Sequence, residues 1–530
     1  MIVDQHNTAD VAILGGGLAG LALARQLRRT VPDLSIVIID AGTHPVPEAA
    51  FKVGESSVEI GADYLARTLG LREHLDEAHL KKFGLRCFFG DSQSIDQADE
   101  LGASRSLPVS AWQMDRGRLE NYLHKSTLED GVRIISGATV SDIDFDTDGS
   151  AVVRYRSESG KAQFRSRRIV DASGRRGLLR KRLSLDAKSD HEGNAAWFRV
   201  DKSVRIDDWT NNAQWHARVP GGKRWLSTNH LMGQGYWVWL IPLASGATSV
   251  GIVVDAKRHP ISSLHTHERA LEWLQCHQPQ CHAAVGSEAM DFHRFHRYAY
   301  SSQRVFSGRR DQGDWFMTGE AGQFVDPFYS PGLDFIAYGN TFVTDLIKRD
   351  FSGEDTRARR RAHEHGLAAI HTSTLDLYRG QYNGFGNFRL MTLKTVWDYA
   401  YYWCVLGFLH VNEALTDTEL LAEHSAALAQ ARARHREIQA AFRTAASRQP
   451  VLTPSGRFAD HGSMPMMREL NGRLAGPVAG SLSSAFASSL AELDRIGAAL
   501  LPEFDAAYDS KAPPAWLYDE LTASPLKKAS

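Results

Sequence analysis

The chain has 530 residues, which predicts a large α/β domain with a second region attached. Lys and Arg (61) nearly balance Asp and Glu (62), so the net charge of -1 does not favour nucleic acid or an anionic membrane as a partner. Four cysteines do not form a disulfide framework, and the N-terminus lacks the pattern of a signal peptide. The most apolar later stretch, residues 401–410, is far shorter than the roughly 20 residues of a transmembrane helix. We therefore expect a cytoplasmic protein, without a transmembrane segment, whose partner is a small molecule.

Residues 10–41 read as a strand, a glycine turn, a helix and a second strand. Gly15, Gly17 and Gly20 form a G-x-G-x-x-G motif in the turn, where the backbone can approach a pyrophosphate at the helix N-terminus. Asp40 ends the second strand, where a carboxylate would bind a ribose 2'-hydroxyl. A glycine turn without a ligand is common for an isolated motif, but the combination predicts a dinucleotide site that includes Leu18 and Ala19.

Further strand-like runs follow at residues 132–146, 151–157 and 167–173, and several more lie between about 190 and 260. The latter group predicts a substrate-side sheet. From about residue 335 the pattern is helical and no strand is expected.

Residues 167–177 and 315–332 each run from a predicted strand into a glycine turn. They resemble the second and third FAD signatures of the flavoprotein monooxygenase and halogenase superfamily. The resemblance implies FAD as the cofactor, with Gly319 and Glu320 beside it. Residues 112–123 also resemble a helix start of this superfamily, which makes Arg116 either an FAD contact or a solvated helical arginine.

These patterns predict an α/β fold in which a Rossmann-type FAD-binding domain carries an inserted substrate-side β-sheet and is followed by a mostly helical C-terminal region. The FAD-binding domain would span residues 1–340 and include the sheet at about 190–260. The helical region, residues 341–530, would cap the substrate site.

The segment 235–243 contains W-x-W-x-I-P as Trp237, Trp239, Ile241 and Pro242. It resembles the diagnostic motif of flavin-dependent halogenases. Alternation along a strand places Trp237, Trp239 and Ile241 on one face, and two indoles there form a bulky wall. In the family this wall is thought to keep the organic substrate away from the flavin, so that halide reacts there instead. The alternative is an ordinary aromatic core strand.

A second block, residues 51–71, resembles the V-G-E-[AS]-[ST] segment of the same family and implies that Gly54, Glu55 and Ser56 lie at the cofactor. Residues 81–89 follow, where the family carries an essential lysine at the start of a strand. Lys82 matches this position and Lys81 lies one place early, although a surface pair of lysines is the alternative. Alternation predicts Lys82, Gly84 and Arg86 on one face of the strand. A lysine in a partly dry pocket can hydrogen-bond or react with hypohalous acid.

Residues 326–335 resemble the family's halide loop with two departures. Tyr329 stands where tryptophan halogenases have Glu, and Pro331, which supplies no N–H, replaces Thr. Ser330 and Gly332 are retained. We therefore expect a phenolic, pyrrolic or other activated ring as the substrate, lined by Tyr329 and by Tyr382 and Trp397 of the capping region. Aromatic residues of this kind are, however, more often helix core.

The resemblance implies an enzyme that uses FADH2 from a separate flavin reductase, oxygen, and chloride or bromide as the halide ion to make hypohalous acid. The halogen would pass through Lys82 to an electron-rich aromatic substrate, free or carrier-bound, with Trp237, Trp239 and Ser330 completing the catalytic set. The first alternative is an FAD-dependent aromatic hydroxylase, which needs neither the Trp wall nor Lys82. A non-catalytic FAD-binding protein is a second. No metal is expected, because the Cys and His residues between 276 and 296 match no common zinc spacing.

Overall fold

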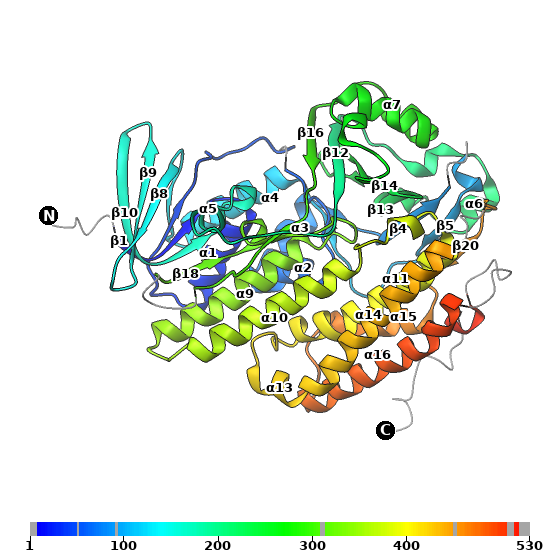
Figure 1. Ribbon diagram of the computed structural model, residues 1–530. Coiled ribbons are helices and arrows are strands. Elements are labelled where there is room, and N and C mark those ends of the chain that lie inside the picture. Colours follow the sequence, from blue (N-terminus) through cyan, green and yellow to red (C-terminus); the bar gives the residue numbers. More distant parts are fainter. Residues whose placement is uncertain are drawn as a thin grey trace.

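The computed structural model describes residues 8–49, 52–90, 94–307, 313–448, 453–505 and 514–518. Two β-sheets lie side by side, and a layer of long helices from the C-terminal half runs beneath both of them (Figure 1). Among the residues so described, no helix is long and apolar enough to cross a membrane.

The first sheet is built on β1, whose last four residues are fully buried, and which pairs in parallel with β2 and β10. The segment predicted as one strand at 132–146 is two strands, because Gly137 turns the chain with a left-handed φ of 64°. The sheet has the order β7-β2-β1-β10-β9-β8 with β18 paired to β10, and comprises β1 (Thr8–Leu14), β2 (Ile36–Ile39), β7 (Arg133–Ile135), β8 (Thr139–Phe145), β9 (Ala151–Ser157), β10 (Gly160–Asp171) and β18 (Trp315–Met317).

The second sheet is larger than the one expected at about 190–260, because it recruits strands from both ends of the chain. Its order is β16-β12-β15-β14-β13-β4-β5-β20, with β4 (Leu85–Phe89), β5 (Asp99–Gly102), β12 (Gly193–Val200), β13 (Thr228–Gly233), β14 (Tyr236–Pro242), β15 (Thr248–Asp255), β16 (Asp291–His296) and β20 (Phe458–Asp460). The expectation of no strand after residue 335 is therefore wrong. β20 has only three residues, too few for an alternating pattern, and it forms by pairing in parallel with β5.

Two smaller sheets and a set of short helices complete the N-terminal part. One small sheet pairs β3 (Leu80–Lys81) with β6 (Trp112–Gln113), and the other contains β11 (Asp186–Ala187), β17 (Tyr300–Ser302) and β19 (Gln323–Phe324). The helices are α1 (Leu18–Thr30), α2 (Glu59–Asp63), the π-helix η2 (Tyr64–Thr68), α3 (Arg72–Ala78), α4 (Arg116–Glu129), α5 (Leu178–Arg182), α6 (Ala213–Ala217), α7 (His267–His277) and α8 (Pro279–Val285).

The helical layer is packed around α11, which contacts both α14 and α16 and is buried on nearly all sides. Its helices are α9 (Gly332–Phe351), α10 (Arg357–Asp376), α11 (Phe388–Tyr401), the π-helix η11 (Tyr402–Gly407), α12 (Phe408–Val411), α13 (Thr418–Glu423), α14 (Ser425–Arg448), α15 (Pro465–Gly472) and α16 (Leu482–Asp505).

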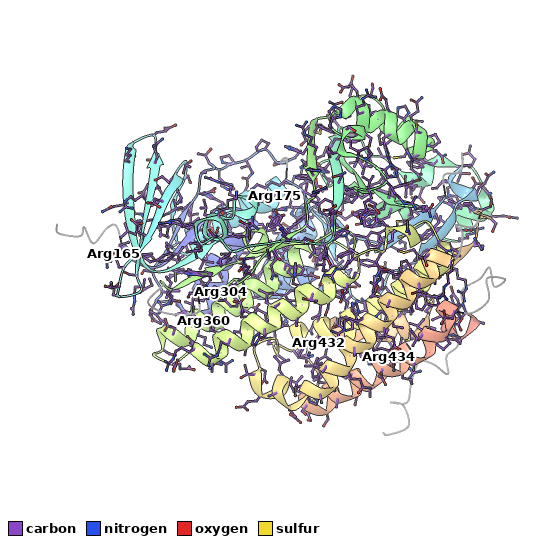
Figure 2. The ribbon with its side chains drawn as sticks, viewed as in Figure 1. Arg165, Arg175, Arg304, Arg360, Arg432 and Arg434 are labelled. Carbon is purple, nitrogen blue, oxygen red and sulfur yellow. The ribbon has the colours of Figure 1, made fainter. Side chains whose placement is uncertain are left out.

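Charged pairs join this layer to the first sheet. Arg360 of α10, labelled in Figure 2, forms an ion pair of 2.8 Å with Asp314 next to β18. Arg168 of β10 forms another with Asp350 of α9. The first two layer helices are therefore attached to the nucleotide-binding half of the molecule.

Candidate active site

A cavity of about 520 Å³ extends from the glycine turn after β1 to the indoles of β14. We call it the glycine-loop cavity. Most of the residues predicted for the cofactor and the Trp wall line it, namely Gly15, Gly17, Leu18, Ala19, Asp40, Gly54, Glu55, Ser56, Arg116, Trp237, Trp239, Gly319, Glu320, Ser330 and Gly332.

Gly20 is not among the described residues that line this cavity. A Cβ on Gly20 would lie 2.0 Å from the carbonyl oxygen of Gly15, so this glycine lets α1 pack against the turn. Gly15 itself has a left-handed φ of 116°, which favours glycine. A Cβ on Gly17 would meet only Lys52 Nζ, at 3.5 Å, so the space beside Gly17 is open to a ligand.

The glycine-loop cavity has positive charge where a pyrophosphate would bind. α1 starts at Gly17 without a side-chain cap, which leaves its first N–H groups available to an anion. Arg116 and Lys52 both bind Glu120, each at 2.6 Å, and Arg116 Nη1 also donates to the carbonyl of Val53. Together with Asp40 at the end of β2, this donor set fits a dinucleotide such as FAD.

Glu320 lies at the same cavity, and burial raises the pKa of its carboxyl. The positive charge of Arg175 opposes that shift most strongly, with smaller effects from Arg116 and Lys52. Arg175 in turn lies over the ring of Phe295, 4.7 Å from its centroid. The basic side chains around this cavity thus act on the carboxyl of Glu320, and their positive charge would also favour an anionic ligand.

A buried ion pair ties the predicted cofactor segment to the Trp wall. Arg199 Nε donates to Glu55 over 2.8 Å, and Ser249 Oγ donates to the other oxygen of Glu55 over 2.7 Å. The indole N–H of Trp239 in turn donates to Ser249 Oγ over 3.1 Å. Burial raises the pKa of Glu55 to about 7, against the opposing charge of Arg199. These hydrogen bonds therefore connect the Glu55 segment to the Trp239 indole.

Trp237 and Trp239 lie side by side with ring centroids 5.6 Å apart. Trp237 Nε1 donates to Tyr382 Oη over 3.2 Å, and Tyr382 donates to the buried carboxylate of Asp326. Asp326 Oδ2 also accepts from Tyr298 and lies 2.8 Å from His191 Nε2. Tyr382 thus supports the wall from behind.

Tyr382 and Trp397, predicted to line the substrate site, are not among the described lining residues of this cavity or of the one below. Trp397 is fully buried in the helical layer, where its indole donates to His435 over 3.2 Å. Both belong to packed interior networks, as aromatic side chains on buried helices usually do.

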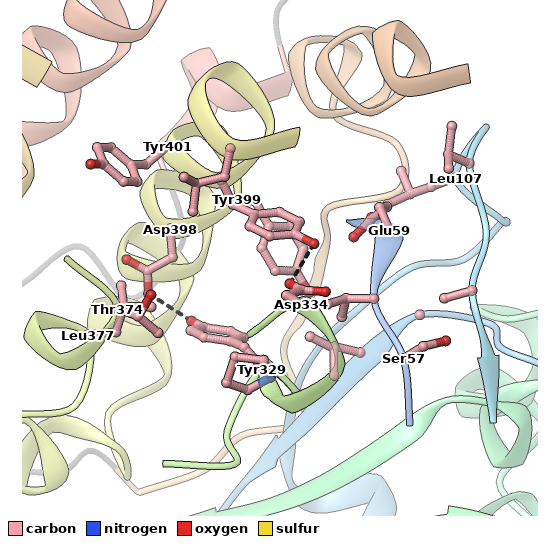
Figure 3. A pocket seen from close by; sticks show the side chains of 18 of the residues that line it. Ser57, Glu59, Leu107, Tyr329, Asp334, Thr374, Leu377, Asp398, Tyr399 and Tyr401 are labelled. Carbon is pink, nitrogen blue, oxygen red and sulfur yellow. Dashed lines mark hydrogen bonds between the residues drawn. The ribbon is translucent and has the colours of Figure 1, made fainter. Parts of the chain in front are cut away.

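A second cavity of about 110 Å³, the lysine cavity, lies between the second sheet and the helical layer. Figure 3 shows Tyr329, Asp334, Glu59 and the tyrosines of α11 around it. Its described lining includes Ser57, Glu59, Lys82, Phe83, Tyr329, Pro331, Asp334, Phe335, Tyr378, Asp398, Tyr399, Tyr401 and Tyr402.

The structure distinguishes the two adjacent lysines. Lys81 belongs to β3 and is exposed, whereas Lys82 is only 6% exposed. Lys82 Nζ donates to Ser56 Oγ over 2.8 Å and to the carbonyl of Ser57 over 2.9 Å. Lys82 lies in the loop before β4, not at a strand start. The alternating pattern places Arg86 on the same strand face as Lys82. In the structure Arg86 is also buried, in an ion pair with Glu100.

Burial lowers the pKa of Lys82 to about 8, and the charges of Glu59 and Asp334 oppose the shift. Sequence reasoning missed both carboxylates. Each follows a recognised motif closely, since Glu59 comes three residues after Ser56 and Asp334 two after Gly332. A search for acids just downstream of these motifs would have found them.

Two short segments separate the cavities. Tyr329 and Ser330 both have left-handed backbones, with φ of 70° and 57°, which is strained for residues other than glycine. Tyr329 lines the lysine cavity, Ser330 the glycine-loop cavity, and Pro331 both. Ser56 and Ser57 likewise line opposite sides. Lys82 is thus hydrogen-bonded to the partition itself.

Tyr329 is fixed on the lysine-cavity side by the helical layer. Its hydroxyl donates to Asp398 Oδ2 over 3.0 Å, and the same oxygen lies 2.9 Å from Lys394 Nζ. Gln439 Nε2 donates to the other oxygen of Asp398 over 2.7 Å. The aromatic side chain at the position of the family's Glu therefore faces a carboxylate that is already neutralised.

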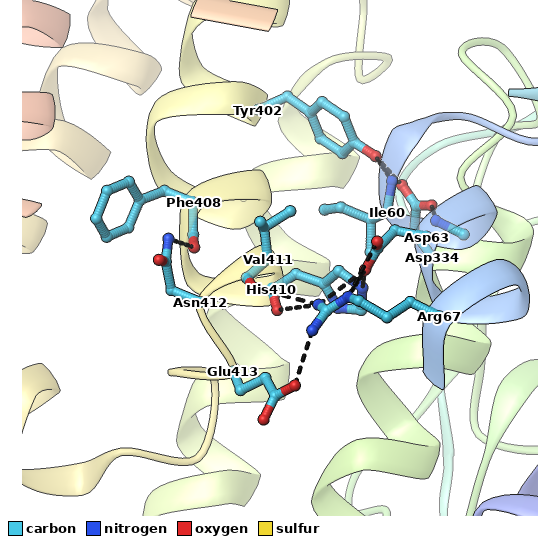
Figure 4. A network of polar contacts seen from close by, with 11 residues as sticks. Ile60, Asp63, Arg67, Asp334, Tyr402, Phe408, His410, Val411, Asn412 and Glu413 are labelled. Atoms are coloured by element: carbon cyan, nitrogen blue, oxygen red, sulfur yellow. Dashed lines mark hydrogen bonds and ion pairs between the residues drawn. The ribbon is translucent and has the colours of Figure 1, made fainter. Parts of the chain in front are cut away.

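Polar contacts also fix α2 and η2 against the helical layer beside the lysine cavity (Figure 4). Tyr402 Oη donates to Asp334 Oδ2 over 2.9 Å and accepts from the backbone N–H of Ile60 over 3.0 Å. Arg67 of η2 binds Asp63 at 2.9 Å and Glu413 at 2.7 Å. The segment that carries Glu59 is thus held at both ends.

Comparison with known proteins identifies the relatives of this arrangement. A model of the tryptophan halogenase family matches residues 90–359, just over half of the chain, and a model of NAD(P)-binding Rossmann-like domains matches residues 13–77. The flavin-dependent halogenase chlA of Dictyostelium discoideum is 28% identical over 436 residues, covering 76% of this chain and 70% of that protein. A 1H-pyrrole-2-carbonyl-[peptidyl-carrier protein] chlorinase of Pseudomonas fluorescens is 26% identical over 345 residues, 61% of this chain and 72% of the relative.

The fold also matches a solved structure over nearly its whole length. Halogenase PltM, in complex with phloroglucinol and FAD, gives a TM-score of 0.64 at 17% identity and covers 93% of this chain and 96% of that one. The chain belongs to the tryptophan halogenase family and is a flavin-dependent halogenase.

Proposed function

We propose that this enzyme transfers chlorine or bromine to an electron-rich phenolic or pyrrolic ring held in the lysine cavity, with Lys82 directing the halogen. The observation that carries the proposal is the contact of Lys82 with the partition between the cavities. Lys82 is buried, unlike its neighbour Lys81, and it donates hydrogen bonds to Ser56 and Ser57 in the segment that divides the cavities. A hydroxylase that passes oxygen directly to its substrate needs no such division.

Reduced FAD in the glycine-loop cavity supplies the oxygen activation that oxidises the halide. Gly332 and Leu333, in the first turn of α9, line this cavity, and the N–H groups of a helix start attract an anion. Ser330 cannot contribute its N–H, which already donates to the carbonyl of Pro327 over 2.8 Å. The halide would therefore lie beside Gly332 and Leu333, with the Trp237 and Trp239 wall excluding an aromatic substrate.

Lys82 would act on hypohalous acid once this has passed the partition. Its ammonium group hydrogen-bonds the oxygen of the acid and polarises the halogen toward the ring. The low dielectric around a buried amine strengthens that interaction, and the positioned group replaces random encounter in solution. A separate flavin reductase would supply FADH2, since the sequence has a single G-x-G-x-x-G motif, at Gly15, Gly17 and Gly20, and its turn lines the glycine-loop cavity.

The lining of the lysine cavity supports a small activated ring. The cavity, at about 110 Å³, is smaller than the roughly 150 Å³ that holds benzene, so its lining would have to move slightly for a single ring and much more for two fused rings. Tyr329 replaces the Glu of tryptophan halogenases, and the carrier-bound pyrrole in the names of two relatives supports a pyrrolic alternative to a phenol.

The decisive experiment compares Lys82→Ala with Lys81→Ala in the presence of FADH2, oxygen, bromide and a panel of phenols, pyrroles and indoles. We expect Lys82→Ala to oxidise FADH2 normally but to form roughly 100-fold less halogenated product or lower still, since positioning of a reactant contributes several orders of magnitude. Lys81→Ala, altered at an exposed position, should keep the wild-type rate.

Mass spectrometry of the products separates the outcomes. Near wild-type halogenation by Lys82→Ala would contradict the role of this lysine. Hydroxylated products without halogen, formed by the wild-type enzyme, would establish the aromatic hydroxylase instead. Rapid turnover of free tryptophan relative to phenols and pyrroles would contradict the substrate class.

A further inference from the structure

Two carboxylates, Glu59 and Asp334, line the lysine cavity and act on the charge of Lys82. Their hydrogen bonds differ. Both oxygens of Asp334 are engaged by the protein, Oδ1 by the backbone N–H of Gly61 at 2.8 Å and Oδ2 by Tyr402 at 2.9 Å. Asp334 therefore holds α2 and η11 in place.

Glu59 is instead placed to meet a ligand. It is the first residue of α2, and its Oε1 accepts from Asn471 Nδ2 over 2.9 Å. The Trp403 side chain also interacts with the carboxyl, and the Glu59 side chain keeps partial exposure at the cavity. Figure 3 shows its carboxyl group among the cavity side chains, on the same side as Ser57. Burial also raises the pKa of Glu59 above its ordinary value, which makes it a better proton acceptor than an exposed carboxylate.

The reaction needs such a group. Tyr329 occupies the position where tryptophan halogenases have Glu, and Asp398 behind it is already bound by Lys394, Gln439 and Tyr329. Among the carboxylates that the structure describes in the cavity lining, Asp334 and Asp398 have both oxygens bound by protein groups, whereas Glu59 lines the cavity and its charge acts on Lys82.

We propose that Glu59 is a catalytic residue that accepts a hydrogen bond, and then the proton, from the O–H or N–H group of the aromatic substrate, so that the enzyme selects rings that carry such a donor. This inference rests on the proposed function, because it concerns the ring that Lys82 halogenates.

The step balances with hypohalous acid as the oxidant. As the substrate O–H or N–H proton moves to Glu59, the ring carbon attacks the halogen, the carbon–halogen bond forms and the halogen–oxygen bond breaks. The departing hydroxide takes a proton from the Lys82 ammonium and becomes water. The ring carbon then loses its hydrogen as a proton to the Lys82 amine, and Glu59 returns its proton to the substrate. The net change is the aromatic ring plus hypohalous acid giving the halogenated ring plus water, with both side chains restored.

The test measures selectivity between matched substrates that differ only in the donor. Resorcinol is paired with 1,3-dimethoxybenzene, and pyrrole with N-methylpyrrole, and kcat/KM is determined for each by product mass. In Glu59→Gln the Oε1 acceptor for Asn471 is preserved, so the fold should be too; FAD binding and the thermal midpoint check this.

We expect the wild-type enzyme to prefer the donor-bearing ring by roughly 100-fold, the scale of one positioned proton acceptor, and Glu59→Gln to abolish that preference by slowing only the donor-bearing substrate. FADH2 oxidation should be unchanged. The matched control is Glu73→Gln on α3, an exposed carboxylate whose loss should leave the preference intact.

Retention of the preference in Glu59→Gln would overturn the inference while leaving the proposed function standing. Loss of the preference in Asp334→Asn but not in Glu59→Gln would assign the proton acceptor to Asp334 and also overturn it. Absence of any halogenated product from the wild-type enzyme with all four substrates would overturn both proposals.

Discussion

Replacing Gly251 by alanine should displace the Trp239 indole. Gly251 of β15 pairs with Trp239 of β14, and a Cβ on Gly251 would lie 2.2 Å from two atoms of the indole ring. The ring cannot simply swing away, because it is only 4% exposed and its N–H donates to Ser249. Overpacking costs about 1–3 kcal/mol. Loss of the indole hydrogen bond adds about 1 kcal/mol. A total of about 2–4 kcal/mol corresponds to an unfolding equilibrium shifted by roughly 30- to 1,000-fold.

The assay measures the thermal midpoint and the halogenated product formed per FADH2 consumed. Gly251→Ala should lower both, since Trp239 is part of the wall and is linked through Ser249 to Glu55. Gly476→Ala is the control, because its backbone is extended, with φ of 178°, and a Cβ there meets nothing within 4 Å. A Gly251→Ala enzyme with the wild-type midpoint and product yield would refute both the packing argument and the role of the wall.

Gly17→Val should weaken FAD binding in a titration while leaving the thermal midpoint of the FAD-free protein nearly unchanged, because the space beside Gly17 is open. Gly20→Val should lower that midpoint as well, since a Cβ there clashes with Gly15, and equal effects of the two variants would contradict this division of roles. Burial raises the pKa of Asp334 to about 7 from 3.8, so the folded protein holds a proton that the unfolded chain releases, and stability falls as pH rises between these values. The thermal midpoint of Asp334→Asn should therefore fall less than that of wild type between pH 5 and pH 8; parallel curves would show that Asp334 does not titrate in this range.

The motifs with a fixed backbone requirement were predictable from the sequence. The turn at Gly15 and Gly17, the acid Asp40 and the alternating indoles of Trp237 and Trp239 depend on neighbours in the sequence, and the structure places all of them at one cavity. Lys82 could be chosen over Lys81 by its register with the following glycine, although its loop position and its hydrogen bonds to Ser56 and Ser57 could not.

What the sequence left undetermined depends on distant segments. Glu59 and Asp334 are separated by 275 positions, and only the packing of α2 against α9 brings them to the same lysine. The positions of Tyr382 and Trp397 away from the described cavity linings have a related reason: a helical aromatic pattern shows that a side chain is buried, but not which buried surface it meets. β20 was missed because its pairing partner β5 lies more than 350 residues earlier.

The pairing of β20 with β5 also bears on how freely these enzymes can be recombined. The C-terminal helices look like a separate lid. Between α14 and α15, however, the chain returns as β20 to form the edge of the second sheet. That sheet also contains β4, the strand that follows the Lys82 loop. Truncation before β20 would leave an open strand edge at β5, a template for association between molecules. A chimera that exchanges lids between relatives must therefore carry β20 and β5 as a matched pair.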